Sequence, residues 1–217
     1  TNLALKNATI SASVKNVPTN ELPSVGTANI ALSVESMTMD GSRITAESLG
    51  SRNAGNILIN SPSALGKRFE MVNSQINTSA ALADGGNIAI YMKDMVGLTD
   101  STITSSVGNE RIKTTQGGNI TIDPDFVILK GSEIRANAFA GTGGAIDITS
   151  GLFLADAFSL VDASSTLGVS GTVQINSPIN NLSSVVARLP ESLLAVQALL
   201  RASCAARLSE GAASSFV

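Results

Sequence analysis

The chain contains no histidine, no tryptophan, one tyrosine and one cysteine among its 217 residues. The absence of histidine excludes Ser-His-Asp and Cys-His catalysis, and it excludes metal sites that depend on imidazole ligands. The single cysteine, Cys204, excludes an internal disulfide framework, which fits both a cytosolic protein and an exported bacterial protein that avoids cysteine. Because aromatic residues make up only 3% of the chain, the core has to be built from Ile, Leu, Val and Ala.

Charged residues and long apolar runs are also scarce. Charged side chains form 14% of the chain and the net charge is −3, so there is no basic face for a nucleic-acid partner. No run of 18 apolar residues occurs, so we expect no membrane-spanning helix. The N-terminal residues Thr1 to Leu5 lack the basic and apolar regions of a signal peptide, and we expect the sequence to be a fragment of a longer protein.

The chain is organised instead around a short motif that recurs. Its clearest copy is Gly-Gly-Asn-Ile-Thr-Ile at 117–122; the other copies are 54–59, 85–90 and 143–148, with weaker ones at 27–32 and 170–175. The first apolar residue of each copy falls at positions 30, 57, 88, 120, 146 and 173. A period in this range indicates a stacked repeat architecture.

A second motif, a small residue followed two positions later by an apolar one, lies between the copies of the first. Its apolar residues fall at positions 10, 44, 76, 103, 134 and 161. Both motifs alternate apolar and polar residues, and a third apolar stretch follows, as at 37–39, 126–129 and 151–154. Three short strands per repeat predict an all-β fold, a parallel β-helix of about five to six coils in which successive coils rise by roughly 4.8 Å.

Two features of the first motif have a structural explanation. The glycine pairs before each strand predict a tight corner that requires positive φ and no Cβ. The recurrent asparagines, Asn29, Asn56, Asn87 and Asn119, predict a ladder of stacked amides that ends at Ala145 and Thr172. A role for these asparagines as ligands is the alternative that repeat logic disfavours.

The repeat spacing is interrupted three times. Residues 14–26 and 107–116 lengthen the same link of the repeat, so we expect both loops on one side of the solenoid, about 14 Å apart. Residues 65–69 lengthen another link and should emerge elsewhere. Loops on a rigid scaffold often carry binding sites, although length variation without a role explains them equally well.

The repeats end near Pro178, which divides the chain into a β-helix at 1–177 and a C-terminal part at 178–217. Residues 180–184 are predicted as a loop, and Pro190 opens an amphipathic helix whose apolar stripe is Leu193, Val196, Leu200 and Cys204. Because a solenoid end exposes an open core, we interpret 178–208 as a capping helix. A partner-binding helix is the alternative, and Cys204 is interpreted as a small buried residue.

Acidic residues are the remaining candidates for chemistry. The best pair is Asp123 and Asp125, which flank Pro124 after a strand, and Asp94 and Asp100 come next. Paired carboxylates suit glycoside cleavage or a calcium site, but Asp-Pro-Asp is also common turn chemistry. Sugar grooves need stacking rings, and Tyr91 is the only tyrosine. We therefore assign no catalytic, cofactor-binding or metal-binding residue.

The run from Gly117 through Ala138, the copy at 171–175 and the tail that begins Leu189-Pro190-Glu191 resemble filamentous-haemagglutinin-type exoproteins of two-partner secretion systems, specifically their C-terminal repeats. The resemblance implies a right-handed β-helix at the surface of a Gram-negative bacterium, secreted through an outer-membrane transporter as its partner. We accordingly expect a non-enzymatic, structural and adhesive segment of a surface exoprotein, with a host or neighbouring-cell receptor or glycan as a further partner. The alternative is a β-helical module that binds or cleaves polysaccharide.

Overall fold

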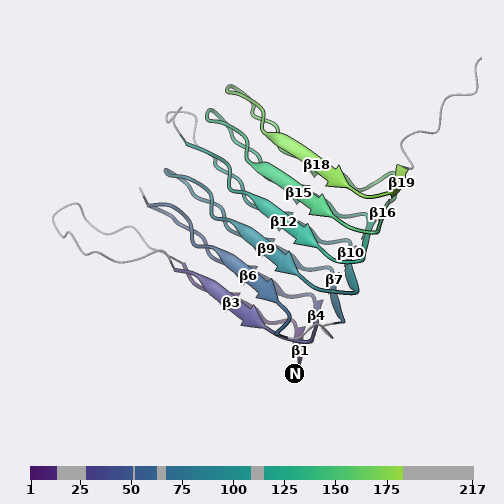
Figure 1. Ribbon diagram of the computed structural model, residues 1–217. Coiled ribbons are helices and arrows are strands. Elements are labelled where there is room, and N and C mark those ends of the chain that lie inside the picture. The colour runs from purple at the N-terminus through teal and green to yellow at the C-terminus, as the bar shows by residue number, and fades with distance from the viewer. Residues whose placement is uncertain (14–27, 51, 63–66, 109–114, 183–217) are drawn as a thin grey trace, which may run out of the picture. The chain divides into compact units, whose positions relative to one another are not determined.

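The computed structural model describes residues 1–13, 28–50, 52–62, 67–108 and 115–182. This part of the chain is all-β, and its strands form three parallel sheets (Figure 1). Sheet A contains β1 (Asn2–Lys6), β4 (Ser36–Asp40), β7 (Arg68–Val72), β10 (Met95–Thr99), β13 (Phe126–Lys130), β16 (Leu152–Ala155) and β19 (Ile179–Leu182). Sheet B contains β2 (Thr9–Ser11), β5 (Arg43–Thr45), β8 (Gln75–Asn77), β11 (Thr102–Thr104), β14 (Glu133–Arg135) and β17 (Leu160–Asp162). Sheet C contains β3 (Ile30–Ser33), β6 (Ile57–Asn60), β9 (Ile88–Tyr91), β12 (Ile120–Asp123), β15 (Ala145–Thr149) and β18 (Thr172–Asn176).

The chain visits sheets A, B and C in turn, so each triplet of consecutive strands is one coil of a parallel β-helix. The register matches the two sequence motifs residue for residue. In sheet C, Ile30, Ile57, Ile88, Ile120, Ile146 and Val173 stand in one row. In sheet B the row is Ile10, Ile44, Ile76, Ile103, Ile134 and Val161. The predicted fold class, including the third strand of each repeat, is confirmed.

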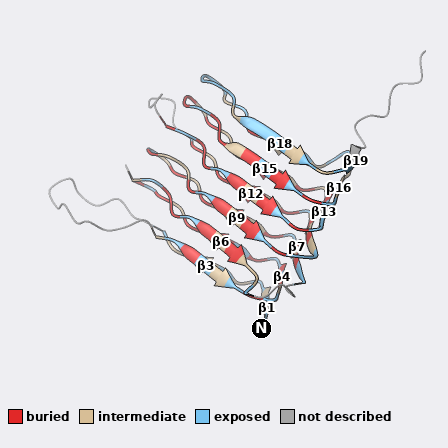
Figure 2. Ribbon diagram, in the orientation of Figure 1, coloured by how far each residue is buried: buried red, intermediate tan, exposed pale blue. Residues whose placement is uncertain are grey.

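The core consists of these rows and of the inward side chains of sheet A. The largest fully buried side chains include Phe69, Phe153, Met37, Met71 and several of the row isoleucines. Figure 2 shows the strands of sheet C largely buried in the middle coils, whereas β18 in the last coil is mostly exposed. Each coil therefore buries its apolar side chains against the coils on either side, as expected of a solenoid.

The glycine corner differs from the prediction in one respect. The two glycines with positive φ in the described chain are Gly41 and Gly131, and neither belongs to the glycine pairs. The paired glycines are required by crowding. A Cβ on Gly86 would collide with the carbonyl of Gly55, and a Cβ on Gly118 would collide with the carbonyl of Gly86, one coil earlier in each case. The expectation of no Cβ is confirmed, whereas that of positive φ is wrong.

The left-handed backbone occurs instead at the corner between sheets A and B. Asn7, Gly41, Asn73, Asp100 and Gly131 succeed one another there from coil to coil, with φ between 46° and 57°. Asn, Asp and Gly are the residues that tolerate this conformation best. Asp100, a candidate for chemistry in the sequence, is therefore accounted for as a corner residue.

A ladder of buried serines follows this corner and was not expected. It comprises Ser42, Ser74, Ser101, Ser132 and, at the end, the partly buried Ser159. Each hydroxyl accepts the N–H of the equivalent residue one coil earlier, at 3.0–3.1 Å. The first four hydroxyls donate to the carbonyl two residues before them, at 2.7–2.9 Å. The ladder satisfies one backbone N–H per coil that the short strands leave unpaired.

The asparagine ladder is present, with a different bonding pattern. The side-chain oxygens of Asn29, Asn56, Asn87 and Asn119 each accept a backbone N–H from the next coil, at 2.8–3.0 Å. We predicted bonds between amides, whereas the partner is the main chain. The ladder ends at Ala145, which donates its N–H but has no side-chain acceptor.

Several predictions fall on other parts of the chain. Most of the loops at 14–26 and 107–116, and the start of 65–69, lie outside the described residues, as do the helix at 190–208 and Cys204. The strand order does place 14–26 and 107–116 in the same link, from sheet B to sheet C. The predicted loop at 180–184 is wrong in its first part, because β19 extends sheet A through Leu182. The described residues include no helix that is long and apolar enough to cross a membrane.

Candidate functional site

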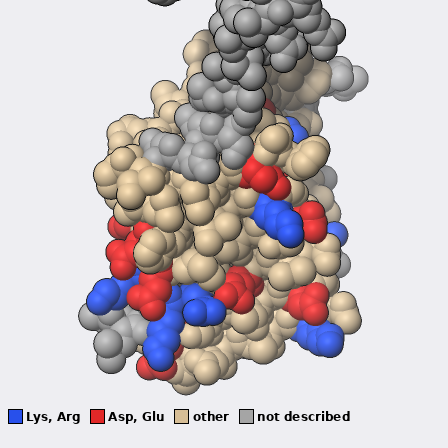
Figure 3. Space-filling model, turned by 90° about the vertical axis from the view of Figure 1, so that its right-hand side faces the viewer, with Lys and Arg blue, Asp and Glu red and all other residues tan. Residues whose placement is uncertain are grey.

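The outer face of sheet A changes character along the solenoid. Its outward residues form three adjacent columns, two positions apart on each strand, and the third column runs Val72, Thr99, Lys130. The first column runs Arg68, Met95, Phe126, Leu152, and the second runs Glu70, Gly97, Ile128, Leu154. The first two columns are therefore charged on β7 and apolar from β10 to β16, whereas the third column carries Thr99 and Lys130 beside them. Figure 3 views this side of the molecule and shows uncharged surface between separate groups of charged side chains.

The apolar half of this face is unusually open to solvent for large aliphatic and aromatic residues. Phe126 is 46% exposed and Ile128 38% exposed, and Ile179 on the last strand reaches 61%. An exposed apolar surface with a polar rim is typical of an interaction site. This surface, from Met95 to Ile179, is the candidate functional site.

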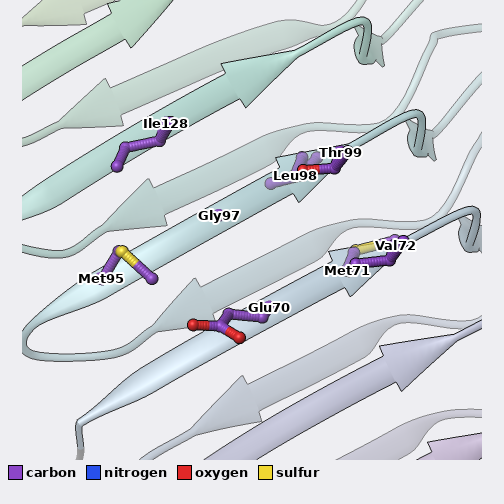
Figure 4. A pocket seen from close by; sticks show the side chains of 8 residues that line it. All are labelled: Glu70, Met71, Val72, Met95, Gly97, Leu98, Thr99 and Ile128. Carbon is purple, nitrogen blue, oxygen red and sulfur yellow. The ribbon is translucent and has the colours of Figure 1, made fainter.

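A hollow of ≈ 200 Å³ lies in this face over Gly97 on β10. Figure 4 shows its walls, with Met95 on the same strand, Glu70 and Val72 on β7, and Ile128 on β13. The backbone of Gly97 forms the floor because no side chain rises there. Apolar walls with one carboxylate at the rim suit an apolar side chain that carries a positive group or a hydrogen-bond donor beside it.

Nothing in the backbone requires a glycine at this position. A Cβ on Gly97 would meet Met95 Cε at 3.6 Å and Glu70 Cγ at 3.9 Å, which are ordinary contacts, and its φ is not positive. Glycine inside a strand lowers stability by roughly 0.5–1 kcal/mol relative to alanine. A strand glycine without a structural reason marks a place where another molecule can approach closely.

An ion pair borders the hollow. Arg68 Nη1 lies 3.2 Å from Glu70 Oε1, on the same face of β7. The two side chains are 59% and 38% exposed, so water screens the pair and leaves both groups able to contact a partner. The charged end of the candidate surface thus carries one cation and one anion side by side.

The acidic residues singled out in the sequence are separated by the fold. Asp123 ends β12 in sheet C, whereas Asp125 precedes β13 in sheet A, with the buried Pro124 at the corner between them. Asp94 and Asp125 occupy equivalent positions of successive coils, directly before β10 and β13. All three are exposed. In the described chain, no group of three or more Cys, Asp or Glu residues could hold a metal ion.

Asp123 has one neighbour of interest. It pairs in register with Tyr91 of β9, which is 44% exposed on the same outer face of sheet C. A phenol ring beside a carboxylate is a combination that sugar-binding surfaces use.

A second hollow, of ≈ 330 Å³, lies beside the link between sheets B and C. Glu47, Asn77 and Ser79 contribute its polar groups. The amide of Asn77 donates to Glu47 Oε1 at 2.7 Å, and its oxygen accepts the N–H of Ser79 at 2.9 Å. These three groups already satisfy one another, whereas the hydroxyl of Ser48, which also lines the hollow, is buried without a hydrogen-bond partner.

An ionic cluster covers the outer face of sheet B near its end. Arg135 Nε donates to Glu133 Oε2 at 2.8 Å, and this bond lowers the pKa of Glu133. For Asp162, partial burial acts to raise the pKa, but hydrogen bonds from Asn137 and Ser164 and the charge of Arg135 outweigh it and lower the pKa. Both carboxyls are thus held ionised by structural partners, which is typical of a strand-to-strand brace.

The sheet A site could not be read from local sequence because its members lie 26 to 31 residues apart, and only Gly97 within an apolar strand hinted at it. Comparisons with protein-family models, with curated proteins and with solved structures find no match. The resemblance to haemagglutinin-type exoproteins therefore rests on the repeat motifs and the tail from Leu189 alone.

Proposed function

We propose that this chain is a non-enzymatic, structural and adhesive segment of a large secreted exoprotein, displayed as a β-helical stalk on the surface of a Gram-negative bacterium. The full-length protein would reach the surface through an outer-membrane two-partner secretion transporter. The repeat motifs and the parallel β-helix support this proposal, because a solenoid is a stiff element that grows by adding coils.

The construction of the coils favours a stalk. The core rows of isoleucine bury the apolar side chains of each coil against its two neighbours. The serine and asparagine ladders bind backbone N–H groups of adjacent coils. The asparagines are exposed just before the strands of sheet C, whereas the outward positions within the strands are used by neither ladder and are free to differ between coils. Function in such a scaffold belongs to the outer faces.

The observation that carries the adhesive part is the exposed apolar half of sheet A around the Gly97 hollow. Six large apolar side chains, three of them on β10 and β13, share this face: Met95, Phe126, Ile128, Leu152, Leu154 and Ile179. Burying such side chains against another surface stabilises a contact by about 25 cal/mol per Å².

Attachment of the purified chain to cells tests the proposal. Beads coated with the chain should adhere to host or bacterial cells, and Ile128→Lys should reduce adhesion at least about tenfold, since a buried lysine charge opposes the contact. The control Thr102→Lys places the same charge on the outer face of sheet B and should leave adhesion unchanged. Beads that adhere no better than bare beads would remove the adhesive function. Deleting 107–116 separately tests the predicted loop face.

Binding or cleavage of polysaccharide is the second candidate, and the pairing of Tyr91 with Asp123 favours it. A glycan array combined with a lyase and hydrolase screen tests this candidate. Turnover that disappears on Asp123→Asn would replace the adhesive proposal by an enzymatic one. Glycan binding that disappears on Tyr91→Ala, without turnover, would establish a lectin-like module.

A further inference from the structure

The first two outward columns of sheet A, which run through Arg68 and through Glu70, are complementary to each other. On β7 the columns present Arg68 and Glu70, and on β10 they present Met95 and Gly97. At a spacing of two residues, β7 thus presents a cation beside an anion, and β10 presents a long side chain beside a gap.

A second copy of the chain can use this complementarity. Consider two copies with their A sheets face to face, related by a two-fold axis that runs along the stacking direction between the columns. The axis keeps the order of coils and exchanges the columns, so column one of each copy lies on column two of the other. An arrangement of this kind is isologous, since each contact occurs twice.

The charges match in this arrangement. Arg68 of one copy lies opposite Glu70 of the partner copy, and the reverse contact forms at the same time. In the single chain these two side chains already approach each other at 3.2 Å, so a dimer would join two such pairs into a network of four charges.

The shapes match as well. Met95 of one copy lies over Gly97 of the other, where the hollow of ≈ 200 Å³ is open to receive it. On the next strand, Phe126 meets Ile128, so the contact continues as an apolar layer. Methionine is an unbranched, adaptable side chain that fills irregular gaps of this type.

We propose that this chain self-associates through the outer face of sheet A as a two-fold dimer, with Met95 of each copy inserted over Gly97 of the other. The proposal does not depend on adhesion to cells. The contact covers about five coils, or roughly 24 Å by 17 Å from the coil and residue spacings. This footprint is about half of the ~800 Å² per partner found in stable complexes, so we expect a weak dimer that forms only at high protein concentration.

Sedimentation equilibrium of the full chain, up to about 500 µM so that a weak dimer is populated, tests the proposal. The wild type should move from monomer to dimer over this range. Gly97→Val should weaken dimerisation at least about tenfold by filling the hollow, while raising the thermal midpoint, because a β-branched residue replaces a strand glycine. The rise in stability shows that lost association does not come from misfolding.

A mixing experiment tests the charge arrangement. Glu70→Arg and Arg68→Glu should each abolish dimerisation alone, because like charges then meet, and an equimolar mixture of the two variants should dimerise. The control Asp147→Arg makes the same charge change as Glu70→Arg on the outer face of sheet C and should dimerise like the wild type. A wild type that stays monomeric at the highest concentration would overturn the proposal. The occupant of this face would then be something other than a second copy, such as residues 183–217 or a different protein. A dimer unaffected by Gly97→Val, or a mixture that stays monomeric, would overturn it too.

Discussion

The serine ladder makes a quantitative prediction about Ser101. Its hydroxyl accepts the N–H of the buried Ser74 at 3.1 Å and donates to the Thr99 carbonyl at 2.7 Å. In Ser101→Ala the Ser74 N–H stays buried without an acceptor, which costs about 1–3 kcal/mol. The Thr99 carbonyl keeps its bond from Asn73, so its lost contact adds only about 1 kcal/mol. The expected loss in free energy of unfolding is about 2–4 kcal/mol.

The matched control is another buried serine. Ser48 is 1% exposed, and its hydroxyl has no hydrogen-bond partner. The equivalent position of the next coil is Ala80. Ser48→Ala should therefore raise stability by about 0–1 kcal/mol, because it removes a desolvated polar group.

Urea unfolding followed by circular dichroism measures the stability of both variants and of the wild type. Where the slopes of the transitions are equal, the differences between midpoints report differences in the free energy of unfolding. The reasoning rests on the bonds and not on the packing of the hydroxyl. Equal destabilisation by Ser101→Ala and Ser48→Ala would refute it, since the two substitutions remove the same atom from buried sites.

Two further predictions concern the corners. Gly118→Ala should destabilise the fold by about 3 kcal/mol or slow its folding, since its Cβ would collide with the Gly86 carbonyl. The control Gly108→Ala has open space around the new Cβ and should change stability by less than about 0.5 kcal/mol. Thermal unfolding of both variants measures the difference. The carboxylate of Asp156 accepts bonds from Ser159 and from the Gly131 N–H, and these lower its pKa. A lowered pKa contributes stability that is complete above the ordinary aspartate range and is lost as pH falls through the lowered value. The unfolding midpoint of Asp156→Asn should therefore fall less than that of the wild type as the pH is lowered into the acid range. An unchanged pH dependence would count against this role.

The repeating strands were predictable because each carries its own local signal. Ile103 and Ile134 sit in sequences that alternate apolar and polar residues, and their equivalence across coils follows from spacing alone. β19 was missed because Ile179-Asn180-Asn181-Leu182 does not alternate and follows a proline. Its pairing with β16 comes from the completed sheet and not from its own residues.

The ladders were only partly predictable. The small residue that opens the second motif was visible, but the bonds of its hydroxyl depend on the corner before it, where Asp100 adopts a left-handed conformation before Ser101. The candidate acids show the same limit. Asp123 and Asp125 are two residues apart in the chain, yet a corner separates them onto different sheets, and a short spacing says little about distance when a turn intervenes.

Gly118 and Gly97 show why the candidate site could not be found by composition. Gly118 belongs to the recurrent glycine pair and Gly97 is a single glycine within a strand, but neither pattern shows whether a side chain would fit there. Gly118 lies under the Gly86 carbonyl, so the stack of coils requires it. Gly97 has room for a side chain on a strand that a larger residue would stabilise, and it lies between Arg68–Glu70 on one side and Ile128 on the other. Gly97 thus lowers stability without serving the fold, and it lies at the boundary of charged and apolar surface. A substitution there should affect association more strongly than it affects folding. This is why Gly97→Val, which should strengthen the fold and weaken the contact, separates the two roles within one variant.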